Sequence, residues 1–431
     1  MTLLVLVVWL IPIKSYKLPV KLPFNLEIYR LVIILLLAAW LVALWTGNAR
    51  VRAGGRGRLI TVLAAGATAS LLTNLSTISA NGLQTQAVKS LSFFLSYVLA
   101  FLLVSSLLEQ VDEIVTVLRA VAVGAAVVAC AALYESRTHV NVFDHLHSVL
   151  PFLVHFGRDN QNVNGGALRV RASAQHPIAL GSALVMCVPI ALHLSTRAAT
   201  VVRRRLWIGV AGLICMGAMA TVSRTVILML LAMVACAFWL YGRRLLRFWP
   251  LVIVLAALTH VAAPGVVSHL YKRFNPHGGI VSQLNSRAGM RGSGRLTDIG
   301  PGLSQWSGSP LFGHGLGTVA STGDSLATLP SSQNAGVPII FDDQYMNTLV
   351  SIGALGLGCI LLFVWGSVRR MGRTARRFAG RDAALLAACT ISMAGFGAGM
   401  ATFDAFTFVQ GTLLFFIIAA LGLRLRTIVE S

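Results

Sequence analysis

Charged side chains are scarce in this sequence. Only 11% of the 431 residues are charged, whereas 56% are hydrophobic. About a quarter of the residues in a soluble domain are charged, so this composition excludes a soluble globular fold. At ~20 residues per membrane-spanning helix, the apolar runs use well over half of the chain and leave no room for a separate soluble domain. We therefore expect an all-α, polytopic membrane protein with a single integral membrane domain over residues 1–431.

Acidic residues are the rarer charged class. The chain has 14 Asp and Glu against 35 Lys and Arg, which gives a net charge of +21. An excess of this size suggests a nucleic-acid partner in a soluble protein. In a membrane protein, Lys and Arg first serve as topology signals beside anionic membrane lipids. Because the loops account for most of the positive charge, we expect contacts with lipid and no nucleic-acid partner.

Cysteine is absent from the polar stretches. All six cysteines lie inside apolar runs, where thiols behave as small hydrophobic side chains. This distribution argues against a disulfide framework and against a cysteine metal site. Four histidines in one polar loop have no supporting cluster of carboxylates or cysteines, and the paired acidic motif that holds a divalent ion under a phosphate is missing. We expect neither a metal nor another cofactor.

What the sequence has in abundance is apolar segments, about twelve of them, separated by polar or arginine-bearing stretches. The first is short, lacks the small-residue cleavage site of a signal peptide and is followed by three lysines, so it is interpreted as a weak first span or an interfacial helix. The segments are approximately Thr2–Ile13, Ile28–Trp45, Leu59–Leu75, Val88–Leu108, Ile114–Tyr134, Pro177–Leu194, Leu206–Val222, Val226–Tyr241, Trp249–Leu270, Tyr345–Val368, Ala383–Phe403 and Phe406–Leu423.

The arginines of the short loops predict the orientation. If the N-terminus is cytoplasmic, every arginine-rich short loop falls on the cytoplasmic side, as the positive-inside rule requires. Only the lysines after the first segment (Lys14, Lys17 and Lys21) break this pattern. The cytoplasmic clusters are Arg50 to Arg58, Arg197 to Arg205, Arg243 to Arg247, Arg369 to Arg381, and Arg424 with Arg426.

The opposite face receives two long polar loops, residues 135–175 and residues 271–344, the second between the ninth and tenth segments. Both loops carry arginines although the topology bias disfavours them there. An anionic ligand at that face explains such arginines better than chance placement does. Arg224 is the clearest example, because it lies between two apolar runs with almost no loop. A charge inside or beside the membrane core costs free energy and is usually functional. Its alternative interpretation is an interfacial anchor whose side chain extends to the membrane surface.

The second long loop holds a glycine-rich element around a histidine, Pro310-Leu311-Phe312-Gly313-His314-Gly315-Leu316-Gly317. Glycines permit unusual backbone conformations and let a bulky substrate approach closely. An imidazole is the side chain most easily poised between acid and base near neutral pH. His314 is therefore a candidate catalytic residue, and a plain flexible turn is the alternative.

Several motifs together resemble the O-antigen ligase and polymerase superfamily of bacterial inner-membrane proteins. Each motif is weak alone, but their order and their fit to the topology make the combination specific. They are Arg171 with His176-Pro177, Ser223-Arg224-Thr225, Gly294-Arg295 with Trp306, the glycine-rich element around His314, and Asp343-Gln344-Tyr345 opening a span that contains Gly353 and Gly356.

The resemblance implies a periplasmic active site built on a helical membrane bundle. With a histidine in its glycine-rich element, the chain resembles the ligase branch of the superfamily. Enzymes of that branch transfer a polysaccharide from undecaprenyl pyrophosphate to a sugar hydroxyl of the lipid A core. A related polymerase adds a similar donor to another lipid-linked glycan and is the nearest alternative. By this resemblance His314 accepts or orients the proton of the attacking hydroxyl. Guanidinium groups match phosphate oxygens, so the pyrophosphate is assigned to Arg171, Arg224 and Arg295, with Arg287 and Arg291 as further candidates.

Asp343 has two interpretations. It aligns His314 or a sugar, or it is a carboxylate favoured by the dipole at a helix N-terminus. The competing functional class is a transporter or flippase of anionic lipid-linked substrates, which explains outward arginines and many helices without any reaction. Transporters usually contain broken helices in paired halves with charges near the membrane midplane.

The arginine asymmetry generates a topology prediction. It places Arg373 in the cytoplasm and Ser325 on the opposite side. Single cysteines introduced at the two positions should react oppositely with a membrane-impermeant thiol reagent in intact cells. Labelling of both from the same side contradicts the orientation, and a parallel reaction in opened membranes controls for cysteines that are buried.

Overall fold

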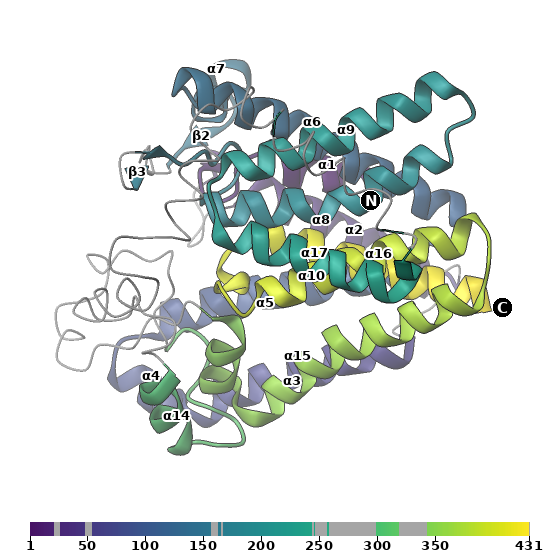
Figure 1. Ribbon diagram of the computed structural model, residues 1–431. Coiled ribbons are helices and arrows are strands. Elements are labelled where there is room, and N and C mark those ends of the chain that lie inside the picture. The colour runs from purple at the N-terminus through teal and green to yellow at the C-terminus, as the bar shows by residue number, and fades with distance from the viewer. Residues whose placement is uncertain are drawn as a thin grey trace, which may run out of the picture.

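The computed structural model describes residues 1–20, 26–47, 54–156, 163–164, 167–243, 245, 257, 299–318 and 343–430. Long helices dominate and run roughly side by side, as Figure 1 shows. The longer helices are α2 (Ile28–Trp45), α3 (Gly54–Thr73), α5 (Gln84–Leu107), α6 (Val111–Thr138), α8 (Pro177–Thr196), α9 (Val201–Ala220), α10 (Arg224–Tyr241), α15 (Gln344–Arg377), α16 (Arg381–Gly399) and α17 (Val409–Glu430).

Shorter elements connect these helices. The helical ones are α1 (Thr2–Leu10), α4 (Leu75–Ala80), η1 (Val142–His145), α7 (Leu146–Val149), α14 (Ile299–Ser307) and η6 (Ala405–Thr407). Four two-residue strands form two antiparallel pairs: β1 (Tyr16–Lys17) pairs with β2 (Val154–His155), and β3 (Val163–Asn164) pairs with β4 (Ala167–Leu168). The all-α fold class is thus confirmed, since these strands are minor.

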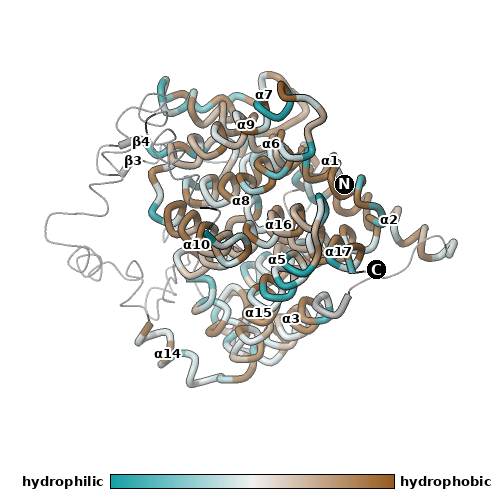
Figure 2. The backbone as a smooth tube through the Cα atoms, turned by 45° about the vertical axis from the view of Figure 1, so that its right-hand side comes forward, coloured by the Kyte–Doolittle hydropathy of each residue, from teal (hydrophilic) through white to brown (hydrophobic). Residues whose placement is uncertain are grey.

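Among the described residues, eight helices are long and apolar enough to cross a membrane by length and composition. Most of the backbone tube in Figure 2 carries the hydrophobic colour along these helices. Their burial differs widely: only 22% of the apolar window of α2 is buried inside the protein, against 83% for α16. Large apolar residues exposed on α2, such as Leu35 and Val42, therefore have lipid as their natural solvent.

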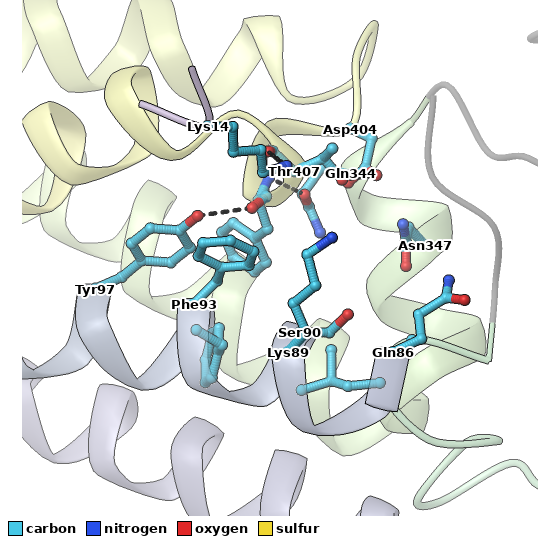
Figure 3. A pocket seen from close by; sticks show the side chains of 14 residues that line it. Lys14, Gln86, Lys89, Ser90, Phe93, Tyr97, Gln344, Asn347, Asp404 and Thr407 are labelled. Carbon is cyan, nitrogen blue, oxygen red and sulfur yellow. Dashed lines mark hydrogen bonds between the residues drawn. The ribbon is translucent and has the colours of Figure 1, made fainter. Parts of the chain in front are cut away.

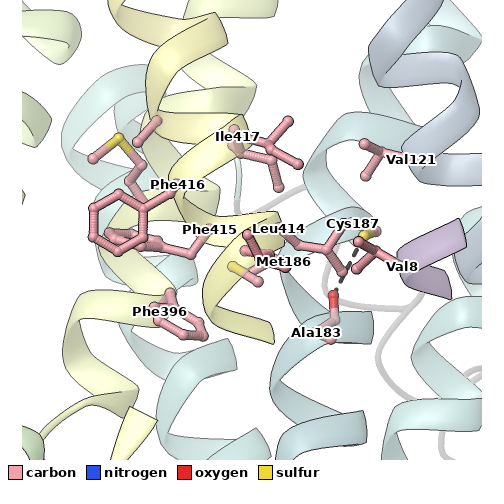
Figure 4. Packing of buried hydrophobic residues seen from close by; sticks show 14 of the residues in the cluster. Val8, Val121, Ala183, Met186, Cys187, Phe396, Leu414, Phe415, Phe416 and Ile417 are labelled. Atoms are coloured by element: carbon pink, nitrogen blue, oxygen red, sulfur yellow. Dashed lines mark hydrogen bonds between the residues drawn. The ribbon is translucent and has the colours of Figure 1, made fainter. Parts of the chain in front are cut away.

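Helix α17 forms the centre of the bundle. An unbroken stretch from Val409 to Gly422 is buried, and it packs against α5, α8 and α16. Stacked aromatic rings connect the helices, with the ring centroids of Phe396 and Phe415 4.6 Å apart (Figure 4). Hydroxyl groups buried in the bundle donate to backbone carbonyls, as Ser392 Oγ does to Met186 O at 2.7 Å. The core is therefore held by aromatic packing with few charges.

Eleven of the twelve expected segments correspond to helices, and the limits of the second match those of α2. The ninth, Trp249–Leu270, lies outside the described residues. Helix α6 extends to Thr138, so the start of the first long loop at residue 135 was wrong by four residues. Helix α15 continues to Arg377, beyond the expected end at Val368, because its last turns leave the apolar core and carry arginines into the polar connection.

The first segment differs from both interpretations made from the sequence. Helix α1 has 9 residues, which span about 13 Å, less than half of a ~30 Å hydrocarbon core. Leu4, Val8 and Trp9 are fully buried, which excludes a helix lying on the membrane surface. Its free C-terminal carbonyl at Val8 accepts a hydrogen bond from Gln410 Nε2 at 2.9 Å. It is a buried half-length helix inside the bundle.

The arginine-rich connections gather at one end of the bundle. Arg197, between α8 and α9, forms an ion pair with Asp382 at the start of α16. Arg424 donates to the Leu108 carbonyl between α5 and α6 at 2.9 Å, and the Arg376 guanidinium lies 5.8 Å from the Trp239 ring near the end of α10. These contacts place the α5–α6, α8–α9 and α15–α16 connections, the end of α10 and the last turns of α17 on the same side, which we call the arginine end. The expected grouping is therefore confirmed for four of the five basic clusters, and the side of Arg50 to Arg58 stays a prediction.

The opposite end carries the polar loops and is called the polar end. Asn141 donates to the Ala172 carbonyl at 3.0 Å, and Tyr16 pairs with His155. Lys14 Nζ donates to the Thr407 carbonyl at 3.2 Å. The lysines at 14 and 17 thus lie with the polar loops, which explains why they depart from the arginine pattern. In Figure 1 this end carries the labels α7, β2, β3, α4 and α14.

Helix α15 is broken near its polar end. Gly353 has φ 80° and ψ −172°, outside the helical region, so the backbone groups on either side lose their helical partners. The glycine-rich element replaces them. His314 N donates to Val350 O at 2.9 Å, Gly315 N donates to Ser351 O at 3.0 Å, and Ala354 N donates to Pro310 O at 2.8 Å. The element around His314 is thus built into the break of α15.

Close backbone contact explains two of its glycines. A Cβ on Gly313 would lie 2.5 Å from the Val350 carbonyl oxygen, and one on Gly317 would lie 2.8 Å from the Gln86 carbonyl oxygen. Both residues also have positive φ, which favours glycine. The expectation that these glycines make room for substrate was wrong, because protein backbone occupies that space. The Phe312 side chain is 38% exposed, so the turn is anchored by its backbone and not by this ring.

The break in α15 generates a stability prediction. A Cβ at Gly353 would overlap the Leu311 carbonyl group and would have to adopt a positive φ. Gly353→Ala should therefore lower the free energy of unfolding by on the order of 1–3 kcal/mol and release the glycine-rich element from α15. Thermal unfolding in detergent and hydrogen exchange at Gly315 and Ala354 measure the two effects.

The matched control is Gly358→Ala, five residues later in the same helix. Its Cβ would meet nothing within 4 Å, and alanine favours a helix. This variant should be as stable as the original protein or slightly more so. Equal behaviour of the two variants would contradict the tight docking inferred at Gly353.

Candidate functional site

His314 is held in a defined orientation at the polar end. Its Nε2 lies 2.6 Å from the carbonyl oxygen of Gln305, in α14. A carbonyl oxygen only accepts hydrogen bonds, so Nε2 carries the proton in this contact. Nδ1 then has a lone pair, and no described residue donates to it. The half-buried ring thus has one nitrogen fixed by the protein, and in the neutral tautomer the other nitrogen can act as a base.

The surroundings of His314 reinforce this orientation. Asn74 Nδ2, between α3 and α4, donates to the Gly313 carbonyl at 3.0 Å, and Ser70 Oγ of α3 donates to the Ser351 carbonyl at 2.7 Å. The end of α3 and the residue after it therefore support both sides of the docked turn. Trp306 Nε1 donates to the Pro310 carbonyl at 3.0 Å. The Trp306 indole, which the sequence pattern singled out, thus fixes the start of the glycine-rich element.

Arg224 lies at the first position of α10, in the tight turn that the sequence indicated. The turn closes because Val222 adopts φ 49°, and the side chain of Arg224 is half-buried. A second arginine contacts the same turn: Arg169, only 6% exposed, donates from Nε to the Thr221 carbonyl at 3.4 Å. Two cationic side chains therefore meet at one turn of the polar end.

Arg171 has a different environment. Its Nη2 donates to both carboxylate oxygens of Asp144, at 2.8 and 2.7 Å. Its backbone N–H and that of Ala172 donate to the two carboxylate oxygens of Glu135. These contacts join the end of α6, η1 and the loop before α8. Arg171 organises the first polar loop through its partner carboxylate.

His176 is the N-cap of α8. Its Nδ1 accepts from Ile178 N at 3.2 Å, which satisfies one of the orphan N–H groups of the helix. Burial, followed by the nearby charge of Arg169, lowers the pKa of His176 to about 4. The ring is therefore neutral near pH 7, as its role as an acceptor requires. His176 is a structural residue that starts α8 beside the arginine turn.

Asp343 is the N-cap of α15. Its Oδ1 accepts from Tyr345 N at 2.8 Å, which corresponds to the helix-terminal interpretation. The alignment of His314 or of a sugar by Asp343 stays a prediction. Arg287, Arg291 and Arg295 lie outside the described residues, so their assignment to the pyrophosphate also stays a prediction.

A cavity of about 80 Å³ opens at the polar end beside the glycine-rich element (Figure 3). Its walls come from α5, the start of α15, the α16–α17 connection and Lys14. The lining residues are Lys14, Gln86, Lys89, Ser90, Phe93, Phe94, Tyr97, Leu316, Gly317, Gln344, Asn347, Asp404, Phe406 and Thr407. None of them was singled out as a site residue from the sequence, although Lys89 interrupts an apolar run and Asp404 separates two.

The α16–α17 connection joins the cavity to the arginine turn. Thr402 Oγ1 donates to Thr225 Oγ1 at 3.0 Å, next to Arg224. A few residues later, Phe406 N donates to Gln344 Oε1 at 2.7 Å at the cavity wall. Arg224, the cavity and the glycine-rich element around His314 therefore lie along one end of the bundle. Within the described residues, Arg171 and His314 are not in contact with Arg224.

The histidines of the first polar loop form no metal site among the described residues, where no group of three His, Cys, Asp or Glu side chains could hold an ion. His147 and His155 have ring centroids 6.3 Å apart, and His155 lies against Tyr16. These rings pack with each other and with β1.

The comparison with protein families agrees with this geometry. No curated protein matches the chain. A family model described as O-antigen ligase matches residues 209–361, a range that contains the Arg224 turn, His314 and the break of α15 but not Arg171 or His176. Together with the helical membrane fold, this match supports membership of the chain in the O-antigen ligase superfamily.

Proposed function

We propose that this protein is an O-antigen ligase, an enzyme that transfers a polysaccharide from undecaprenyl pyrophosphate to the lipid A core at the periplasmic face of the bacterial inner membrane. The observation that carries the proposal is His314, whose Nε2–H is bound to the Gln305 carbonyl at 2.6 Å while Nδ1 keeps its lone pair. Together with the family match, this favours an enzyme over a transporter of anionic lipids.

The reaction follows from these groups. A hydroxyl oxygen of the acceptor attacks the anomeric carbon of the donor, and Nδ1 of His314 takes its proton. The bond between that carbon and the diphosphate oxygen breaks, and the electron pair leaves with undecaprenyl pyrophosphate. Negative charge grows on the diphosphate, where guanidinium groups stabilise it through charge-assisted hydrogen bonds. The protein supplies the base and the cations, so the proposed reaction uses no metal and no cofactor.

The pyrophosphate assignment rests on Arg224, with Arg169 at the same turn as an addition from the structure. The dipole of α10 places partial positive charge at the N-terminus of this helix, beside Arg224. This partial charge adds to the attraction of an anion at the same place. Arg171 is already paired with Asp144, which makes it a weaker phosphate ligand than the sequence suggested. Arg287, Arg291 and Arg295 belong to the proposal through the family resemblance.

His314→Ala provides the first test. The purified variant should bind lipid-linked donor normally, but glycan transfer to lipid A core should fall roughly 10²- to 10⁴-fold, because the proton acceptor is lost. Donor binding and transfer are measured in the same preparation. His145→Ala, an exposed histidine at the same end, is the control and should keep full activity. Normal transfer by the His314 variant would refute a catalytic role for this histidine, and absence of transfer by the original protein would support the transporter alternative.

Arg224→Lys tests the phosphate contact. Lysine keeps the charge but loses the planar fork, so transfer should drop on the order of tenfold or more. Arg203→Lys, on the exposed start of α9 at the arginine end, should have no effect. Normal turnover of a well-expressed Arg224 variant would reduce this residue to an interfacial anchor.

The polymerase alternative differs only in the acceptor. Offering lipid A core and a second lipid-linked glycan in separate reactions distinguishes the two activities. A product attached to lipid A core supports the ligase, and elongation of the lipid-linked glycan alone supports the polymerase.

A further inference from the structure

The cavity at the polar end is lined by two lysines and several uncharged polar side chains. Gln86, Lys89, Ser90, Phe93 and Tyr97 line it at helical spacing along one face of α5. Figure 3 shows Lys89 extending from α5 towards Gln344 on the opposite wall. Among the described residues, Lys89 forms no hydrogen bond and no ion pair, and its side chain is exposed to the cavity and solvent. Its ammonium group is therefore available to a ligand.

Some of the other polar groups that line the cavity are already hydrogen-bonded within the protein, and others are available to a ligand. Both ends of the Gln344 amide are bound within the protein, to Thr348 and to Phe406 N. The Asn347 Oδ1 accepts from Ser351 Oγ at 2.9 Å, so this bond does not use the N–H groups of Asn347 Nδ2. The available groups are thus the Lys89 ammonium and the Asn347 amide nitrogen, with Gln86 and Ser90. Donors of this kind fit an acceptor-rich ligand.

The charged side chains around the cavity also favour an anionic ligand. Lys14 and Asp404 meet at the η6 turn, where Lys14 Nζ donates to the Thr407 carbonyl and the Thr407 hydroxyl donates to Asp404. The charged groups of Lys14 and Arg30 lie 5.1 and 4.8 Å from the centroid of the Phe93 ring. Glu27 accepts from Lys14 N, and burial raises the pKa of its carboxyl group. Three cations therefore surround two carboxylates, and Lys89 supplies the excess.

The size of the cavity limits the ligand. A volume of about 80 Å³ holds several water molecules, since one needs about 10–15 Å³. This space suits a carboxylate or a phosphate group. Leu316 and Gly317, two and three residues after His314, form part of the wall. The ligand would therefore contact the same glycine-rich element that carries His314.

We propose that this cavity is a subsite for an anionic substituent, a carboxylate or a phosphate, on the acceptor glycan, and that Lys89 is its recognition residue. The proposal rests on the proposed function of the site, because His314 defines which substrate is the acceptor. Lys89 and Asn347 donate charge-assisted and neutral hydrogen bonds to the anionic oxygens, and this positions the neighbouring acceptor sugar.

Binding is tested first, on the full-length protein in detergent, with glucuronic acid, glucose 6-phosphate and glucose as probes. The two anionic sugars distinguish the carboxylate from the phosphate, and glucose is the neutral reference. At least one anionic sugar should bind about tenfold more tightly than glucose, and Lys89→Gln should abolish the difference while Lys89→Arg retains it. Equal binding of all three sugars, or a preference that survives Lys89→Gln, would overturn the proposal.

Kinetics provide the second readout. With lipid A core as the acceptor, Lys89→Gln should raise the KM about tenfold and leave kcat and donor binding unchanged. Phosphatase treatment of the acceptor should remove this KM difference if the bound anion is a phosphate and should leave it if the anion is a carboxylate. Lys17→Gln is the matched control, because Lys17 lies at the same end but outside the cavity, over the Phe156 ring. Weakened donor binding would move the subsite to the donor and overturn the acceptor assignment. If the protein transfers no glycan, the proposed function fails, and the sugar-binding experiment still tests the cavity separately.

Discussion

Backbone hydrogen bonds that are lost inside a membrane bundle must be replaced by protein partners, because lipid offers none. At Gly353 the helix α15 breaks and frees the Val350 and Ser351 carbonyls and the Ala354 N–H. The turn from Pro310 to Gly315 supplies the missing partners through three backbone hydrogen bonds of 2.8 to 3.0 Å. The same bonds fix the backbone of His314. A requirement of membrane folding thus determines the position of the candidate base.

This arrangement gives the glycine-rich element two roles. Its backbone completes a broken helix, and its one titratable side chain remains for chemistry. The glycines are needed because the chains approach too closely for a Cβ, as at Gly313 and Gly317. The histidine ring is turned by the Gln305 carbonyl so that only one nitrogen is committed. Local backbone packing and the orientation of the candidate base are therefore coupled in this segment.

The basic side chains of the polar end differ in how far they are neutralised. Arg171 is neutralised by Asp144, and His176 is kept neutral by burial and by Arg169. Arg224 and Arg169 meet at one turn, while Lys89 lies across the α16–α17 connection from them. This separation matches the two anionic groups of the proposed reaction, the diphosphate of the donor and a substituent of the acceptor.

The amino-acid sequence by itself determined the fold class, the position of eleven helices and the grouping of four basic clusters. Apolar length and arginine placement are local properties that lipid and the membrane surface select directly. The pairing of Arg171 with Asp144, the filling of the glycine spaces by backbone, the burial of α1 and the cavity around Lys89 depend on residues far apart in the chain. Only the tertiary structure decided them, because such contacts arise from the packing of α1, α5, α15 and the α16–α17 connection, which no local pattern encodes.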